Sequence, residues 1–376
     1  MSAGANTVSA LRAWLSLTLT PGLGNALGRR LLARFGPPEE VLRHSLADLT
    51  PIVGADCAAR LLATDLSRAA ATTDALKWLD GADTRAILTL DDARYPKRLL
   101  DLSDPPLLIY VAGDPQLLSS SALAIVGSRH ASAAGLLQAG LMAQACTQAG
   151  LSVLSGLARG IDGAAHRGAL EHGGRTFAFV GTGLDRVYPP QHRELAQAML
   201  ERGDALASEL PLGTSAMPAN FPRRNRLIAA AALGVLVIEA ARQSGSLITA
   251  RQGAELGREV FAIPGSIHSP LARGCHLLLR EGAKLVESFE DVLAELPPGL
   301  SQTMPRATQP TPDLDPGPAP SAAPGALHAL GWDPVHMDAL VERTAEDCAH
   351  WSTRLTGWEL DGIVQRLADG RWQRQR

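Results

Sequence analysis

Cysteines, long apolar runs and aromatic residues are scarce in this sequence. The four cysteines, Cys57, Cys146, Cys275 and Cys348, are far apart and form no CxxC pair or metal-like spacing. We therefore expect reduced core residues in a cytoplasmic protein, with no disulfide and no metal site. No run approaches the about 18 uninterrupted apolar residues that a membrane span needs, and the N-terminus lacks the pattern of a signal peptide. These absences argue against secreted, disulfide-stapled and membrane-spanning classes.

Charge of one sign is also lacking. Lys and Arg number 35 against 38 Asp and Glu, which gives a formal net charge of −3. The sequence therefore carries no overall polybasic coat, and any contact with nucleic acid must come from local clusters of basic residues. With 376 residues and 46% hydrophobic residues, the chain is long enough for two or three domains of about 150 residues, each with a core.

A Pro-rich stretch over residues 294–326 divides the chain. Its prolines are interleaved with Ser, Thr, Ala and Gly, so it has few apolar groups to bury and lacks many backbone donors. We predict a linker here. It separates the first part of the chain from a small C-terminal domain at 327–376.

Residues 1–84 show helical periodicity broken by glycine and proline, which predicts a small all-α domain. The stretch from Leu19 to Leu27 contains Pro21, Gly22 and Gly24. This stretch is either an ordinary glycine turn between packed helices or the hairpin of a helix-hairpin-helix (SAM-like) module. In the second case its backbone N–H groups could face a DNA phosphate.

From 85 to 293, short β-rich apolar runs alternate with longer Ala-rich helical ones. This pattern predicts a Rossmann-like α/β domain with a doubly wound, mostly parallel sheet. We expect nine strands, near 86–90, 107–111, 122–126, 152–155, 176–180, 205–208, 235–239, 260–263 and 284–286.

Three of these strands end in glycine-containing loops. The loops begin at Gly127, at Gly156 and at Gly181. In such sheets ligands bind outside the carboxyl ends of the strands, where unpaired N–H groups at helix starts favour anions. Three loops of this kind predict a phosphate-binding edge.

Arginine takes the place of nucleotide-binding motifs at this edge. No loop has the GxGxxG pattern with a later acid, and no GxxxxGK[ST] loop is present. Instead Arg129 follows the first glycine turn, and the densest basic cluster contains Arg223, Arg224, Asn225 and Arg226. Guanidinium groups stay charged and bind phosphate oxygens in pairs. We also expect at least one of these arginines to form a structural ion pair with Asp162, Asp185, Glu209 or Glu239.

Residues suited to catalysis occur without a motif that gives them roles. Ser155, Asp162, His166 and His192 have suitable chemistry, but no GxSxG elbow or HExxH motif contains them. This favours a binding protein over an enzyme, with no cofactor and no metal.

The ordered motifs of the α/β domain resemble the DNA-processing protein A family (DprA, also called Smf). The resemblance runs from Tyr95 and Pro96 to Gly282 and Ala283, and it includes the stretches 125–129, 155–162, 181–185, 221–228, 244–250 and 257–265. It implies a cytoplasmic bacterial protein that binds single-stranded DNA, forms a homodimer through the Rossmann-like domain and helps load the RecA recombinase during natural transformation.

The resemblance also implies which residues contact DNA. The first loop contributes Gly127, Ser128 and Arg129, and the second contributes Ser155, Gly156 and Gly160. The basic motif contributes Arg224, Asn225 and Arg226, beside Arg223, and Arg193 is a weaker candidate.

The C-terminal residues 327–376 resemble the winged-helix module of some family members. Residues 338–343 predict a helix, and residues 363–373 predict a hairpin with a tight turn, the expected wing. The segment from Cys348 to Trp358 departs from the pattern of a recognition helix. A contact with duplex DNA, a contact with protein and a purely structural role all remain open for this module.

Two other functions stay open at this point. One is a nucleotide-processing enzyme of the lysine-decarboxylase-like phosphoribohydrolase type, in which the stretch from Ser244 to Thr249 occupies the place of the family's glycine-rich loop and Glu255 is the nearest acid. Release of base from nucleoside monophosphates would reveal it. The other is an interaction scaffold, which would not shift a labelled oligonucleotide in a gel.

Overall fold

The computed structural model describes residues 2–297, 330, 334–344 and 346–375. The chain divides into two compact units, Met1–Met304 and Pro305–Arg376. Most of the predicted linker lies outside the described residues. Its first residues, 294–297, are described. Helix α13 (Phe289–Glu295) ends at Glu295, and Leu296 is buried in the core of the first unit. The folded part therefore extends beyond the predicted end at residue 293.

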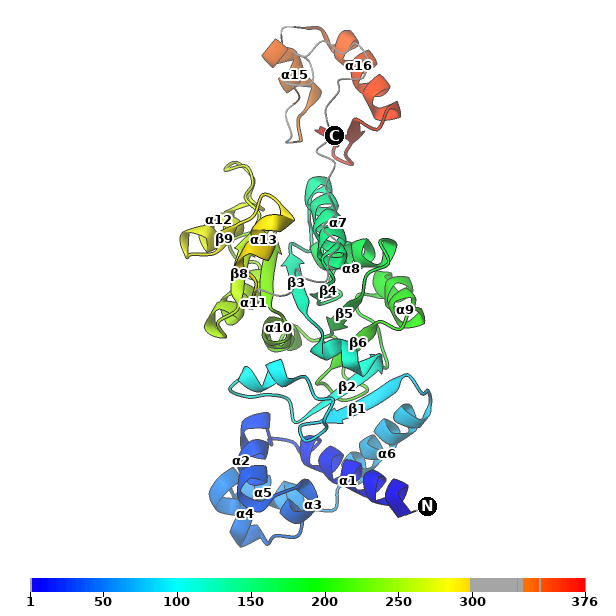
Figure 1. Ribbon diagram of the computed structural model, residues 1–376, viewed down its shortest axis with the longest axis vertical. Coiled ribbons are helices and arrows are strands. Elements are labelled where there is room, and N and C mark those ends of the chain that lie inside the picture. The colour runs from blue at the N-terminus through cyan, green and yellow to red at the C-terminus, as the bar shows by residue number, and fades with distance from the viewer. Residues whose placement is uncertain (1, 298–329, 331–333, 345, 376) are drawn as a thin grey trace. The chain divides into compact units, whose positions relative to one another are not determined.

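A nine-stranded sheet forms the centre of the first unit (Figure 1). All nine predicted strands are present, within two residues of the expected bounds. The spatial order is β1-β2-β6-β5-β4-β3-β7-β8-β9. The strands are β1 (Arg85–Thr89), β2 (Leu108–Gly113), β3 (Ala122–Gly127), β4 (Ser152–Ser155), β5 (Thr176–Phe179), β6 (Ala205–Ser208), β7 (Gly234–Ile238), β8 (Glu259–Ala262) and β9 (Lys284–Leu285).

The sheet is parallel from β6 to β9 and antiparallel at the β1-β2-β6 edge. The predicted doubly wound, mostly parallel architecture is thus confirmed. From β3 the chain winds outward through β4, β5 and β6, and it then returns to β7 on the other side of β3. The order therefore reverses between β3 and β7, and such a switch point is where open α/β sheets bind ligands.

One face of the sheet is covered by α7 (Ala133–Gln148), α8 (Ile161–Glu171) and α13. Since side chains alternate along a strand, Leu123 and Ile125 of β3 point to this face. Helix α9 (Arg193–Glu201) packs beside them against β5 and β6.

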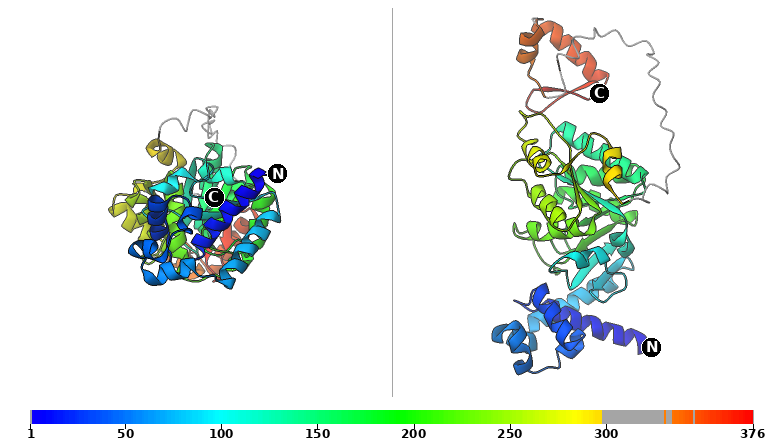
Figure 2. Two further views of the ribbon diagram at one scale, coloured as in Figure 1. Left: turned by 90° about the horizontal axis from the view of Figure 1, so that it is seen from below. Right: turned by 60° about the vertical axis from the view of Figure 1, so that its left-hand side comes forward.

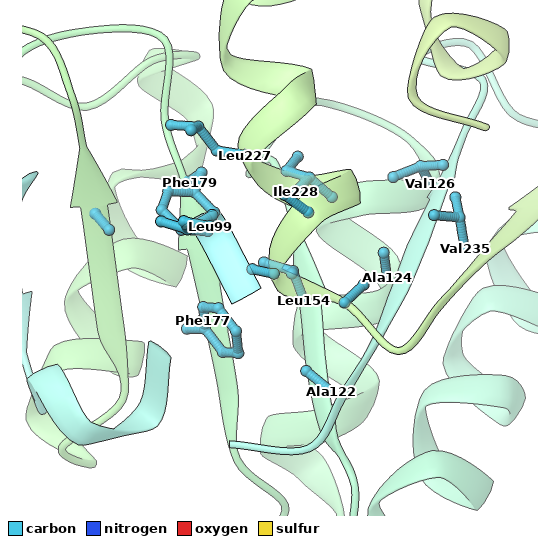
Figure 3. Close-up of a cluster of buried hydrophobic side chains, with 14 of the residues drawn as sticks. Leu99, Ala122, Ala124, Val126, Leu154, Phe177, Phe179, Leu227, Ile228 and Val235 are labelled. Atoms are coloured by element: carbon cyan, nitrogen blue, oxygen red, sulfur yellow. The ribbon is translucent and has the colours of Figure 1, made fainter. Parts of the chain in front are cut away.

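The opposite face is covered by α10 (Asn220–Ala231), α11 (Gly245–Glu255) and α12 (Arg273–Arg280). Figure 3 shows Leu227 and Ile228 of α10 beside Leu154, Phe179 and Val126 of the sheet. Figure 2 shows the sheet between the two sets of helices. The core thus holds the first turns of α10 and α11 at the carboxyl ends of β3 and β7.

The N-terminal helices share a core with the edge of this sheet. They are α1 (Ser2–Thr18), α2 (Asn25–Phe35), α3 (Pro38–Val41), α4 (Leu46–Val53), α5 (Ala55–Leu62) and α6 (Leu66–Asp80). Trp14, Leu31 and Leu61 of the helices belong to one buried cluster with Ile87 and Tyr110 of β1 and β2. The described residues before β1 form helices and no strand, as predicted, and they belong to one compact unit with the sheet.

The second unit contains α15 (Met337–Thr344), α16 (Cys348–Leu360) and a hairpin of β10 (Val364–Arg366) and β11 (Trp372–Arg374). The predicted first helix and hairpin are confirmed, with Gly370 at a positive φ of 84° in the turn. The segment from Cys348, whose pattern did not fit a recognition helix, is helical because Trp351, Leu355 and Trp358 lie on one buried face.

Candidate nucleic-acid interface

A cavity of about 610 Å³ opens at the switch point of the sheet. Its wall begins with Gly127, Ser128 and Arg129 at the end of β3. It continues with Ala241 and residues 243–246, which follow β7 and start α11. The first turns of α10 complete it. Two predicted elements, the first glycine loop and the basic motif, are therefore brought together.

Arg129 lies over an aromatic ring at this cavity. Its guanidinium carbon is 5.1 Å from the centroid of the Phe221 ring, and the centroid of the Tyr188 ring is 5.6 Å from that of Phe221. Arg129 is exposed and Tyr188 is 46% exposed, and all three side chains line the cavity. A guanidinium that stacks on a ring by its face can still offer the N–H groups at its edge to an anion.

The first turns of two helices, α10 and α11, border the cavity. Helix α11 begins at Gly245, and Ser244 caps it by accepting a hydrogen bond from the N–H of Ser246. Asn225 of α10 donates to the carbonyl of Gly245 at 3.3 Å, which joins the two helices at the wall. The positive ends of both helix dipoles favour negative charge here.

Two buried side chains of opposite charge, Arg224 and Asp162, line the cavity. Arg224 is 4% exposed and donates to the carbonyl of Phe179 at 3.0 Å, while its Nε has no hydrogen-bond partner among the described residues. Asp162 is 7% exposed and accepts N–H donors from Gly156 and Ala158. Burial raises the pKa of Asp162 and the charge of Arg224 opposes this rise. Burial lowers the pKa of Arg224 to about 10, so it is charged at neutral pH.

Two glycines of the predicted site make room for this arrangement. A Cβ on Gly156 would collide with the guanidinium of Arg224. Gly160 has a φ of 72° and lies against the backbone carbonyl of Ser128, so a side chain would be both strained and obstructed there. Both glycines shape the site by close approach of the chain.

Arg226 and Arg223 do not line this cavity. Arg226 is 8% exposed and forms ion pairs with Glu209 at 2.5 Å and with Asp104 at 3.4 Å. Arg223 pairs with Glu209 at 3.0 Å. The expectation that one of these arginines forms a structural ion pair is confirmed, and Arg226 does not share a groove with Arg129.

Four other predicted site residues also lie outside the cavity lining: Gly156 and Gly160, described above, and Ser155 and Arg193. Ser155 is fully buried, and its hydroxyl donates to the carbonyl of Ile125 at 2.6 Å. Arg193 is exposed at the start of α9. Of the other candidate polar residues, His166 and His192 are buried and bond to Thr176 and to the carbonyl of Leu157. Glu255, the acid considered for a nucleotide-processing enzyme, is exposed and does not line the cavity, whereas Ser244, Ser246 and Thr249 do.

Sequence reasoning missed two contributors to the site. The first is the aromatic pair Phe221 and Tyr188, in which each ring directly precedes a proline in the sequence. The start of α11 was also missed, and its signal is a serine N-cap followed by glycine soon after a buried strand.

These features define a Rossmann-like protein with an arginine-lined cavity at the switch point of its sheet, an arrangement suited to phosphate groups. Comparison with known families narrows this class. The family model described as DNA recombination-mediator protein A matches residues 86–297, and the DprA winged helix domain matches residues 305–370. The chain belongs to the DNA recombination-mediator protein A (DprA/Smf) family, as the resemblance indicated.

Relatives support this assignment. Protein Smf of Escherichia coli is 39% identical over 297 residues, which are 78% of this chain and 79% of that protein. DNA processing protein DprA of Streptococcus pneumoniae is 46% identical over 206 residues, 55% of this chain and 72% of its relative.

Two solved structures share the fold. The X-ray structure of DNA processing protein A from Streptococcus pneumoniae is 37% identical, with a TM-score of 0.65, and the match covers 76% of this chain and 96% of that one. DNA processing protein A from Helicobacter pylori, whose structure concerns a single-stranded DNA binding mode, is 26% identical, with a TM-score of 0.51, over 56% of this chain and 94% of that one.

Proposed function

We propose that the cavity between β3 and β7 binds single-stranded DNA. The observation that supports this best is the convergence of Arg129, Arg224 and Asn225 with the start of α11 on one cavity. These groups present charge-assisted and backbone donors, which suit phosphate oxygens. The relative from Helicobacter pylori is described by its single-stranded DNA binding mode.

Phosphate contacts carry most of the affinity in this proposal. Aromatic residues make up only 4% of the chain, and Phe221 with Tyr188 offers a surface for very few bases. Stacking contributes about 1 to 3 kcal/mol per base. Affinity should therefore depend little on sequence and fall with salt, with a slope of about −0.7 for each neutralised phosphate.

The wider role follows the family. We infer that the protein acts in the cytoplasm as a homodimer, that it protects incoming DNA and helps load RecA, and that it has no catalytic activity of its own. Among the described residues, no helix is long and apolar enough to cross a membrane. Within the same residues, no cluster of three or more His, Cys, Asp or Glu could hold a metal ion.

The test is a titration of a labelled oligonucleotide, single-stranded against duplex, at several salt concentrations. We expect tighter binding of the single strand and a linear fall of log K with log salt. A flat salt response or an equal preference for duplex would contradict the proposal. Incubation with nucleoside monophosphates serves as the control for the enzyme alternative, because release of free base would indicate phosphoribohydrolase activity.

A further inference from the structure

The hairpin between α1 and α2 borders a second cavity, of about 520 Å³. Residues 18–25 form one wall, and Leu107, Leu108, Tyr110 and Arg223 contribute to the others. We propose that this hairpin cavity holds a nucleotide of the same DNA strand, farther along from the part bound at the switch point. The inference rests on the proposed function and extends it to a longer footprint.

The hairpin offers backbone donors to this cavity. Helix α2 starts after Gly24, which makes no side-chain cap, and the first backbone bond of the helix runs from the N–H of Gly28 to the carbonyl of Gly24. The N–H groups of the first turn are therefore open to a ligand. Gly22 has a φ of 86°, which permits the tight turn before the helix.

Three arginines surround the same hairpin. Arg60 is exposed and forms no ion pair among the described residues, and a Cβ on Gly22 would lie 3.2 Å from its Nη2. Arg68 is 9% exposed, and within the described part of the chain its guanidinium bonds only to the Thr20 hydroxyl and to two backbone carbonyls. These three acceptors hold the guanidinium beside the hairpin, where its positive charge favours an anion. Arg223, whose side chain is 51% exposed, stands on the opposite wall.

Glu209 places a negative charge at the same cavity. Its Oε2 accepts hydrogen bonds from Arg226, Asn25 and Arg223. Its buried Oε1 forms an ion pair with the Nε of Arg223 at 3.0 Å. Since Glu209 lines the cavity beside the hairpin, a ligand that suits this cavity carries an anionic group for the hairpin and N–H groups on the side of the carboxylate. A nucleotide has both, in its phosphate and in its base.

Helix α10 connects the two cavities. Arg223 borders the hairpin cavity, and its neighbours Arg224 and Asn225 border the cavity at the switch point. The two sites therefore lie on either side of the same helical turns. A strand that leaves the first cavity reaches the hairpin by passing over Arg223.

The test compares the full chain with two variants, Arg60→Gln and Arg34→Gln. Arg34 is a matched control, because it is an exposed arginine in the last turn of α2, at the end away from the hairpin. Each protein is titrated with single-stranded oligonucleotides of about 6 and about 20 nucleotides. We expect Arg60→Gln to weaken binding of the long oligonucleotide alone and to reduce its salt slope by about 0.7 for each phosphate that the variant no longer neutralises.

Two results would overturn the inference. One is equal binding of the long oligonucleotide by the Arg60 and Arg34 variants. The other is an equal loss for short and long oligonucleotides with Arg60→Gln, because the hairpin would then not be a separate site. If the wild type binds neither length, or if Arg129→Gln leaves the short one unaffected, the proposed function itself fails.

Discussion

Helix α10 places neighbouring arginines in two different surroundings. Arg224 reaches the cavity at the switch point, where Arg129 and the start of α11 add further donors. Arg226, two residues later, is enclosed by Glu209 and Asp104 on the other side. The same residue type thus lines the proposed binding site in one place and forms structural ion pairs in the other. The position of the nearest carboxylates, and not the density of basic residues, separates the two roles.

The largest effect should be a loss of stability when the enclosed Arg226 is replaced. Replacing Arg226 by Ala leaves the buried carboxylate of Glu209 with only Arg223 as its cationic partner among the described residues, and we expect a loss of about 3 kcal/mol in the free energy of unfolding. Urea denaturation measures it. The double variant Glu209→Leu, Arg226→Met serves as the control and should recover part of the loss. A stability equal to that of the wild type would show that the ion pair is not structural.

A smaller loss of stability should appear at acid pH, because of the buried side chain of His166. Burial lowers the pKa of His166 to about 3, and its Nε2 has no hydrogen-bond partner in the described part of the chain. The unfolded chain therefore binds the proton first, and stability should fall as the pH drops below about 6.5, by up to about 1.4 kcal/mol per pH unit. The measurement is the unfolding free energy of wild type and His166→Gln between neutral and mildly acid pH. Parallel profiles would exclude this contribution.

Replacing Arg129 at the switch-point cavity should change the affinity for DNA and not the free energy of unfolding. Arg129→Gln removes an exposed guanidinium for which the described residues provide no ion pair, so we expect a stability change within about 0.5 kcal/mol. We expect a loss of about tenfold in affinity for single-stranded DNA, which corresponds to about 1.4 kcal/mol. Fluorescence anisotropy at several salt concentrations measures both the affinity and its salt slope. If this variant unfolds, Arg129 stabilises the fold and the binding role is contradicted.

The smallest effect should be that of Arg193→Gln. This exposed residue starts α9 and lies outside the cavity lining. We expect a change in affinity of less than about 0.5 kcal/mol, because an isolated exposed charge contributes little. The same anisotropy assay measures it, with Arg129→Gln as the reference. A loss as large as that of Arg129→Gln would mean that the strand also runs along α9.

The fold could be predicted largely from the sequence because its signals are local. Each of the nine strands is a short apolar run bounded by turn residues, and the helices between them are long and Ala-rich. The shared core that joins the N-terminal helices to the sheet could not be predicted in this way. The packing of Leu31 and Leu61 with Ile87 and Tyr110 joins segments that are far apart in sequence, and no local pattern encodes it.

The candidate site could be predicted only in part, for a related reason. Gly127, Arg129 and Arg224 were identifiable because they follow strands or cluster in a motif, and the structure places all three at one cavity. The enclosure of Arg226 depends on Glu209 and Asp104, which precede it by 17 and 122 residues. Charge counting along the chain cannot find such a partner.

The shared core of the N-terminal helices and strands β1 and β2 limits how this protein can be shortened. A fragment that begins at β1 would present Ile87, Leu108 and Tyr110 to water in place of their helical cover, and such an apolar surface invites self-association. Fragments made for binding studies should therefore keep the N-terminal helices together with the sheet. Weak or non-specific retention of DNA by a shorter fragment would reflect its exposed apolar edge and not the properties of the intact chain.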